Sequence, residues 1–128
     1  MPKRGDWEWA GDIAEAIRRI RFYTKGFTYP KFWGDTKTQD AVVRNLEIIG
    51  EAAKNISGKF KKNHGNIDWK QIAGMRDKLI HEYFGVNWEI VWDVVKLKLP
   101  ELERQIEQIL HESERDKNEQ PGNPPTQK

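Results

Sequence analysis

The strongest constraint on the fold is the spacing of the large apolar residues, which follows a helical period along most of the chain. In the last third, gaps of four and three residues alternate between seven apolar positions: Trp88, Trp92, Val95, Leu99, Leu102, Ile106 and Ile109. This spacing places all seven on one face of an α-helix. No segment keeps the strict alternation of apolar and polar residues that marks a strand. The pattern therefore predicts an all-α fold.

Two earlier stretches show the same period. The first covers roughly residues 7–24, ends before Gly26, and has the stripe Trp9, Ile13, Ile17, Ile20 and Tyr23. The second follows a cap at Asp35, Thr36 or Thr38 and carries two stripes, Val42, Leu46, Ile49, Ala53 and Ile56 on one side and Ala41, Ile48 and Ala52 on the other. A helix that is apolar on two sides needs neighbours on both. We expect this helix to lie at the centre of the molecule.

Capping residues delimit the remaining helices. Asp68 is a good N-cap for the next helix, and Gly85 provides its end. Asn87 can cap the last helical segment. Pro100 should kink or divide that segment, because proline removes one helix hydrogen bond. Together the segments predict an all-α, up-down bundle of four to five helices.

The connecting segments contain the residues that interrupt helices. The aromatic connector FTYPKFWGD is broken by Pro30 and Gly34, which predicts a packed loop or a single helical turn. The segment SGKFKKNHGN holds two glycines and three lysines, which predicts a basic surface loop. The tail is rich in proline and has no large apolar residue. We therefore expect residues 1–116 to form one helical domain and residues 117–128 to be disordered.

Composition narrows the class of protein further. The chain has 128 residues, enough for one domain, and no cysteine, which excludes a disulfide framework, a thiolate zinc site and a cysteine nucleophile. No stretch has the length of apolar sequence that a membrane span or a signal peptide requires, which predicts a soluble, cytoplasmic protein. Residues 1–100 contain 18 Lys and Arg against 13 acids, whereas residues 101–119 contain three against seven. This asymmetry permits a polyanionic partner.

The usual signatures of phosphate binding, serine hydrolases and zinc proteases are missing from the sequence. The three histidines, His64, His81 and His111, are far apart in sequence, so we expect neither a metal site nor a cofactor. His64 lies in the lysine-rich segment and His111 in the acidic helix, where solvated imidazoles are expected. Only His81 has neighbours that suggest chemistry.

His81 lies in the segment GMRDKLIHEYFG, close to Arg76 and Tyr83. Arg76 and Tyr83 are seven residues apart and share one helix face, whereas His81 points about 140° away from Arg76. The two side chains could converge if the helix loosens near Gly85, if the long arginine wraps round the helix, or if a two-fold axis adds a second chain. From these residues alone, carbonyl capping and solvated charges are the better explanation.

The octet RDKLIHEY, with Arg76, Asp77, His81 and Tyr83, resembles the HepT-like branch of the HEPN superfamily, whose signature is Arg, four residues, His, one residue and Tyr. The resemblance extends to the segments TQDAVVRNLEIIGEAAKNIS, DWKQIAGMRDKLIHEYFGVNWEIVW and LPELERQIEQIL. It covers about residues 7–112.

The resemblance implies a homodimeric HEPN bundle that places two copies of the motif in a cleft on the dimer axis. It implies a metal-independent ribonuclease, the toxin of a toxin-antitoxin pair, with Arg76 and His81 as catalytic residues. The implied partner is a minimal nucleotidyltransferase antitoxin that silences the toxin by transferring AMP to Tyr83, and further assembly with this partner stays open. The implied substrate is RNA, and no membrane is involved.

These residue types suit RNA cleavage. Imidazole titrates near neutrality, so His81 can move the proton of the 2′-OH or of the leaving oxygen, and Arg76 offers a planar fork to phosphate oxygens. A set of nearby polar residues could orient Arg76 or His81, although local ion pairing on an exposed helix explains the central-helix charges about as well: Asp77, Arg44, Asn45, Glu47 and Glu51.

Other marked residues have simpler explanations. Lys59, Lys61 and Lys62 could guide RNA phosphates, but a solvated basic segment is the default. Trp88 and Trp92 could stack on bases, but their spacing favours packing. Two alternatives to the enzyme therefore remain open. One is a non-catalytic helical module that binds a nucleotide or docks a nucleotidyltransferase, and the other is a purely structural helical dimer.

Overall fold

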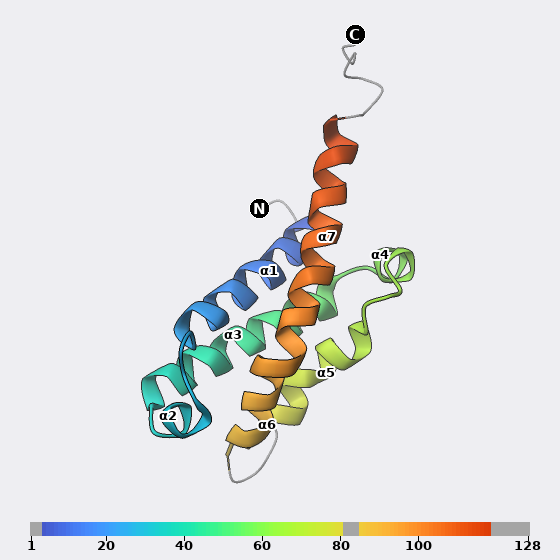
Figure 1. Cartoon of the computed structure of the whole chain (residues 1–128). Helices are drawn as coiled ribbons and strands as arrows, with labels where there is room; N and C mark the ends of the chain where they lie inside the picture. The colour runs from blue at the N-terminus through green and yellow to red at the C-terminus, as the bar shows by residue number, and fades with distance from the viewer. Residues whose placement is uncertain (1–3, 81–84, 119–128) are drawn as a thin grey trace.

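The computed structural model describes residues 4–80 and 85–118, without the side chains of residues 76, 78–80 and 113–118 (Figure 1). All regular structure in this part of the chain is helical, which confirms the predicted all-α class. The elements are α1 (Asp6–Tyr23), α2 (Tyr29–Trp33), α3 (Thr36–Asn55), α4 (Gly58–Asn63), α5 (Trp69–Ile80), α6 (Trp88–Asp93), the π-helical turn η1 (Val94–Lys98) and α7 (Leu99–Asn118).

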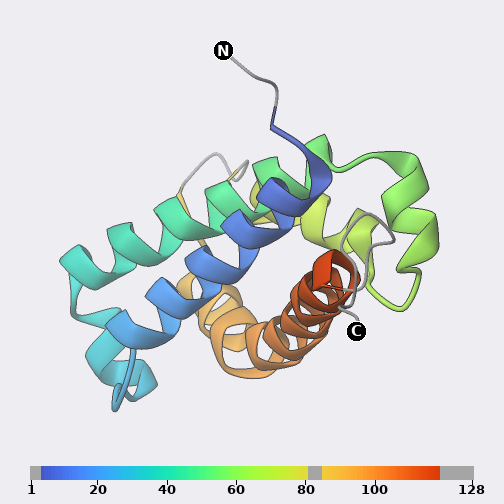
Figure 2. The same cartoon turned by 90° about the horizontal axis from the view of Figure 1, so that it is seen from above.

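The long helices form the bundle, with the short α2 and α4 at its corners. α3 packs against α1 on one side and α5 on the other, as expected for a helix that is apolar on two sides (Figure 1). α1 in turn lies between α3 and α7 (Figure 2). Because α3 has a neighbouring helix on each side, both of its stripes consist of apolar residues.

The core is formed by the predicted stripes. The fully buried aliphatic side chains of α1 and α3 face one another, and α7 closes the third side; the largest members are Ile13, Ile17, Ile20, Val42, Leu46, Ile49, Leu99 and Ile106. Each buried side chain of this size contributes about 1.5–3 kcal/mol relative to an exposed position. The stability of the molecule therefore resides mainly where α1, α3 and α7 meet.

Three of the predicted N-caps are present. The side-chain oxygens of Asp35, Asp68 and Asn87 accept hydrogen bonds from the backbone N–H three residues on, at 3.0, 3.0 and 3.1 Å. Asp35 is thus the cap of α3, out of the three candidates. The hydrogen bond from the Thr38 backbone holds the pKa of the Asp35 carboxyl below its usual value. Local sequence was enough to place these helix starts because a cap bonds within its own turn.

The predicted basic loop at residues 57–66 is wrong, because Gly58–Asn63 form the helix α4. Ser57 caps this helix by accepting from the Phe60 N–H at 3.2 Å, and Asp6 holds Ser57 through bonds of 2.8 and 2.7 Å. Phe60 is buried. The centroid of its ring also lies 4.5 Å from the centroid of the His64 imidazole. His64 is therefore half-buried, whereas the sequence predicted a solvated imidazole. The buried Phe60 ring therefore stabilises a helical turn in a segment whose glycines and lysines predicted a loop.

The connector between α1 and α3 contains the single helical turn α2, one of the two predicted forms. Its Phe32 is fully buried, with ring centroids 5.9 Å from Trp88 and 5.0 Å from Trp92. The two tryptophans of α6 therefore pack on α2, as their spacing favoured. This contact joins α2, which precedes α3 in the chain, to α6, which follows α5.

The effect expected of Pro100 takes the form of a π-helical turn rather than a division. Helical structure continues from Trp88 to Asn118, and the Leu99 N–H donates to the Val94 carbonyl across η1. A π-turn directly before the proline lets the helix pass a residue that has no N–H to donate. α7 ends two residues beyond the expected domain boundary, and the rest of the predicted tail lies outside the described residues.

Candidate functional site

The motif-bearing helix α5 is anchored at its N-terminal end. Asp68 caps it, the Trp69 side chain donates from Nε1 to the His64 carbonyl at 3.0 Å, and both Trp69 and Ile72 are buried. These anchors fix the direction of α5 across α3. Arg76 and Asp77 lie one turn beyond Ile72 and are carried by this helix toward its other end.

The structure places the first half of the motif. Arg76 lies in α5 one turn before Ile80, and Asp77 beside it is half-buried. His81 and Tyr83 lie outside the described residues, so the distances among the three motif side chains stay predictions. Gly85, the predicted helix stop, has a φ of 109°, a conformation that glycine adopts readily and other residues rarely do.

Three of the proposed orienting residues share one face of α3. Arg44, Glu47 and Glu51 fall within about 60° around the helix axis. The Arg44 Nη1 lies 3.9 Å from the Glu47 Oε1, and the Glu51 carboxylate accepts from the Asn55 side chain at 3.2 Å. Local ion pairing on the helix, the alternative that the spacing left open, is therefore present for Arg44 and Glu47, whereas Glu51 accepts a hydrogen bond from a neutral amide.

Asn45 behaves differently from these three. It is buried, and its side-chain amide donates to the Ala41 carbonyl of its own helix at 2.9 Å. A buried amide that satisfies a backbone carbonyl has a structural role in α3. Its described hydrogen bond does not connect it to the motif helix.

An open groove runs between α5 and the α6–η1–α7 rod, with a volume of about 680 Å³. Its apolar wall includes Met75, the residue directly before Arg76, and the groove-facing side chains Ile90, Val94 and Leu97. Leu97 is 70% exposed, which is unusual for a leucine on a helix of the bundle. The Gln105 side chain donates to the Asn66 carbonyl at 3.1 Å, which joins the two walls near one end.

Sequence reasoning missed this groove, although a signal was present. Ile90, Val94 and Leu97 are spaced by four and three residues, like the seam that packs on the core, but they form a second stripe on another face. A second apolar stripe on the last helix indicates a surface that something else covers.

The lysine-rich helix α4 lies away from Arg76. The lysines of α4 lie beside the N-terminal end of α5, whereas Arg76 lies toward its C-terminal end (Figure 1). Across the described ranges, no three histidine or acidic side chains gather as a metal site would require. None of the helices in those ranges is long and apolar enough to cross a membrane.

Comparison with known proteins gives a consistent result. A family model described as "Ribonuclease HepT-like" matches residues 13–109. A protein of Methanocaldococcus jannaschii named "Putative RNase" is 44% identical over 89% of this chain and 94% of its own length. The "Probable ribonuclease HepT" of Thermococcus cleftensis is 48% identical over 84% of this chain and 97% of its own.

A third relative is similar over the motif-bearing region. A protein of Caldanaerobacter subterraneus subsp. tengcongensis, also named "Putative RNase", is 52% identical over 67% of this chain and 77% of its own length. No solved structure matches the chain. The matched residues 13–109 include all of α3, α5 and α6 and therefore the whole segment from Arg76 to Tyr83.

Proposed function

This chain belongs to the HepT-like ribonuclease family of the HEPN type, and from that premise we propose that it is the toxin of a toxin-antitoxin pair, cutting RNA without a metal ion. The observation that carries the proposal is the family match across residues 13–109, which includes the complete Arg76, His81 and Tyr83 motif. The names of the similar proteins support ribonuclease activity at the level of the family.

In the proposed reaction the RNA supplies its own nucleophile. The 2′-oxygen attacks the adjacent phosphorus, the bond from phosphorus to the 5′-oxygen breaks, and the products carry a 2′,3′-cyclic phosphate and a free 5′-hydroxyl. One His81 imidazole takes the 2′ proton, and a second protonates the leaving oxygen. Arg76 binds the non-bridging oxygens, where loss of a preorganised donor costs roughly 3–4 kcal/mol in comparable sites.

Two imidazoles at one phosphate require two chains, because each chain has one His81. A two-fold dimer brings the same segment of both chains together at its axis. The exposed apolar groove supports an interface at this place, since a second copy would cover Met75, Ile90 and Leu97, and Met75 directly precedes Arg76 in the sequence. We therefore propose that the dimer contact runs along this groove.

The proposed partner is a minimal nucleotidyltransferase that acts on Tyr83. The tyrosine oxygen would form a bond to the α-phosphorus of ATP, and pyrophosphate would leave. The added phosphate is an anion on the helix face that Tyr83 shares with Arg76, so it would occupy the guanidinium and exclude RNA. A Tyr83→Phe protein should keep its nuclease activity and escape this partner, which mass spectrometry of the co-expressed proteins would detect as the absence of added AMP.

Cleavage of a short RNA in the presence of a chelator tests the enzyme. We expect products that end in a 2′,3′-cyclic phosphate, abolished by His81→Ala. His111→Ala is the matched control, because His111 is an exposed imidazole on α7 and should leave the rate unchanged. Intact RNA at high concentrations of the wild-type protein would instead favour the non-catalytic module that binds a nucleotide or docks the nucleotidyltransferase.

A further inference from the structure

The corner where α1 leads into α2 concentrates cations and aromatic rings. Between residues 18 and 37 a single acid, Asp35, stands against six basic residues: Arg18, Arg19, Arg21, Lys25, Lys31 and Lys37. The same stretch contains six aromatic residues: Phe22, Tyr23, Phe27, Tyr29, Phe32 and Trp33. Only Phe32 among these six is fully buried. A mixture of this kind suits a ligand that has both negative charge and flat apolar rings.

Part of this corner is a hollow between the end of α1 and the start of α7. It has a volume of about 690 Å³, and its rim includes Arg21, Phe22, Lys25 and Lys96. Phe22 is 76% exposed, so its ring has little protein to pack against. A large ring left in water beside several cations is available to stack on a ligand.

The surface continues from the hollow to α2 through a series of ring contacts. The Lys96 ammonium lies 5.1 Å from the centre of the Trp92 ring, and the Tyr29 ring lies 6.3 Å from Trp92 and 6.4 Å from Trp33. Trp33 is 58% exposed. The basic-aromatic surface defined by this path consists of Arg21, Phe22, Lys25, Lys31, Trp33 and Lys96.

The ammonium groups of its three lysines are available to bind a ligand. Within the described part of the chain, Lys25, Lys31 and Lys96 form no ion pair, whereas Arg21 pairs with Glu103. The Lys31 ammonium lies over the Phe27 ring at 4.4 Å. Contact with a ring face restricts a lysine side chain while leaving its N–H groups free to bind oxygen.

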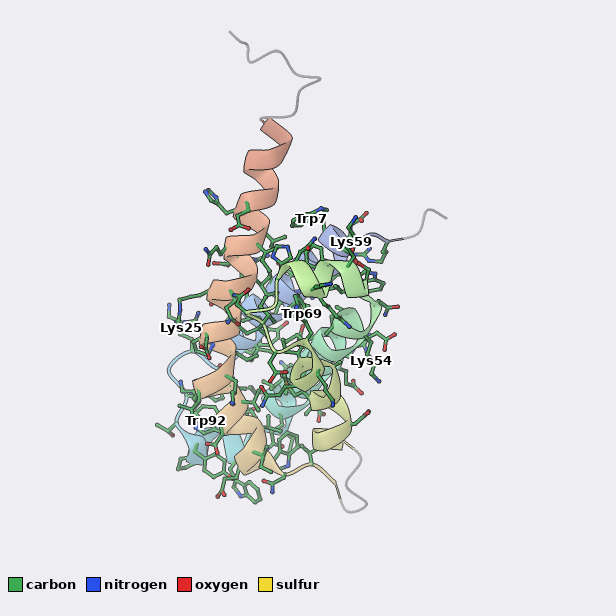
Figure 3. The ribbon with its side chains drawn as sticks, turned by 90° about the vertical axis from the view of Figure 1, so that its right-hand side faces the viewer. Trp7, Lys25, Lys54, Lys59, Trp69 and Trp92 are labelled. Atoms are coloured by element: carbon green, nitrogen blue, oxygen red, sulfur yellow. The ribbon has the colours of Figure 1, made fainter. Side chains whose placement is uncertain are left out.

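The position of the surface relates it to the motif. Figure 3 shows Lys25 and Trp92 on one side of the molecule and Lys54 and Lys59 on the other. α6, which carries Trp92, packs on α2 and begins three residues after Gly85. The surface therefore adjoins the helix that directly follows the motif segment.

We propose that the basic-aromatic surface binds single-stranded RNA next to the cleavage site, an inference that rests on the proposed ribonuclease function and names how its substrate is held. Phosphates contact Lys25, Lys31 and Lys96, and unpaired bases stack on Phe22 and Trp33. A duplex is excluded as the preferred ligand because its bases are already stacked and paired. The surface gives length and strand preference to an enzyme whose motif contacts only the reacting phosphate.

Binding of a 2′-O-methyl oligonucleotide of about 12 nucleotides tests this proposal, with fluorescence anisotropy as the readout. This ligand lacks the attacking hydroxyl, so its affinity is measured whether or not the protein cleaves RNA. We expect Phe22→Leu and Trp33→Leu each to raise the Kd about tenfold, the loss typical of one stacked base. An abasic strand of equal length should bind the wild-type protein and both variants alike.

Charge removal provides the matched comparison. The Lys25→Gln/Lys31→Gln protein should bind more weakly and lose about 1.4 from the slope of log K against log salt, which is two phosphate contacts on a single strand. The Lys59→Gln/Lys62→Gln control removes the same charge from α4, on the other side of the molecule, and should change the Kd less than twofold.

Equal losses in the two lysine pairs, or unchanged binding in the two aromatic variants, would overturn the proposal. Binding of a duplex as tight as that of the single strand would also overturn it. A protein that binds the strand as expected but leaves cleavable RNA intact would refute the ribonuclease function while preserving this surface.

Discussion

The bundle has two regions with opposite properties. Where α1, α3 and α7 meet, the apolar stripes of the three helices are buried against one another and the sequence pattern is regular. Along α5, α6 and η1, by contrast, apolar side chains such as Met75, Val94 and Leu97 are only partly covered. The first region is covered by contacts within one chain, whereas the second leaves apolar surface that a partner would bury. Stability and function are thus expected to respond to different substitutions.

The largest effect should come from the first region. Leu46 is fully buried on α3, and Leu46→Ala should lower the free energy of unfolding by about 2–5 kcal/mol, because it removes buried methyl groups and leaves a cavity. Urea unfolding followed by circular dichroism measures this loss. Leu97→Ala is the matched control from the second region and should cost much less. Equal losses at the two leucines would remove the distinction between the regions.

The second effect should appear in assembly. Leu97→Lys places a charge in the groove while changing little inside one chain, because this side chain is 70% exposed. We expect a shift from dimer to monomer in sedimentation and a loss of RNA cleavage of at least tenfold, while the helical content measured by circular dichroism stays unchanged. Leu97→Met keeps the apolar surface and should keep both properties. A Leu97→Lys protein that stays a fully active dimer would show that the groove is not the interface.

The smallest effect concerns the response of helix caps to acid. The pKa of Asp35, the cap of α3, is lowered by the Thr38 N–H, so its stabilisation is present above pH 3.8 and is lost as the pH falls through the depressed value. The cap of α6, Asn87, does not titrate. Urea midpoints between pH 5 and pH 2.5 should therefore fall less in Asp35→Asn than in the wild-type protein. An identical decline in both proteins would contradict the role assigned to Asp35.

The features that the sequence predicted well are the local ones. Asp35, Asp68 and Asn87 cap within their own turns, and the helical stripes need only a period. The helix α4 was missed because its stability depends on Phe60 packing against Trp69, a contact between separate segments. For the groove, the sequence carried one wall as the stripe Ile90, Val94 and Leu97, but the groove itself exists only where α5 lies beside η1.

The sequence predicted which residues form the candidate site, but it did not predict how these residues are arranged in space. By residue spacing alone, Arg76 and His81 point to different sides of a helix. Only the family resemblance indicated that they act at one site. Of the orienting residues, Asn45 turned inward to its own helix because its position falls on the buried side of α3. A helix period predicts which residues are buried, but it does not predict how two copies of a chain meet.

The most direct test of the central claim is the nuclease activity of mixed dimers. Wild-type protein and an equal amount of His81→Ala protein are exchanged to equilibrium, with an equal mixture of wild-type and His111→Ala protein as the control. If each cleavage needs one His81 from each of two chains, only the dimers with two wild-type chains cut RNA. These are one quarter of all dimers, so the activity should be about one quarter of that of the control mixture. Activity of about one half, the share expected from chains that act alone, would contradict the shared site.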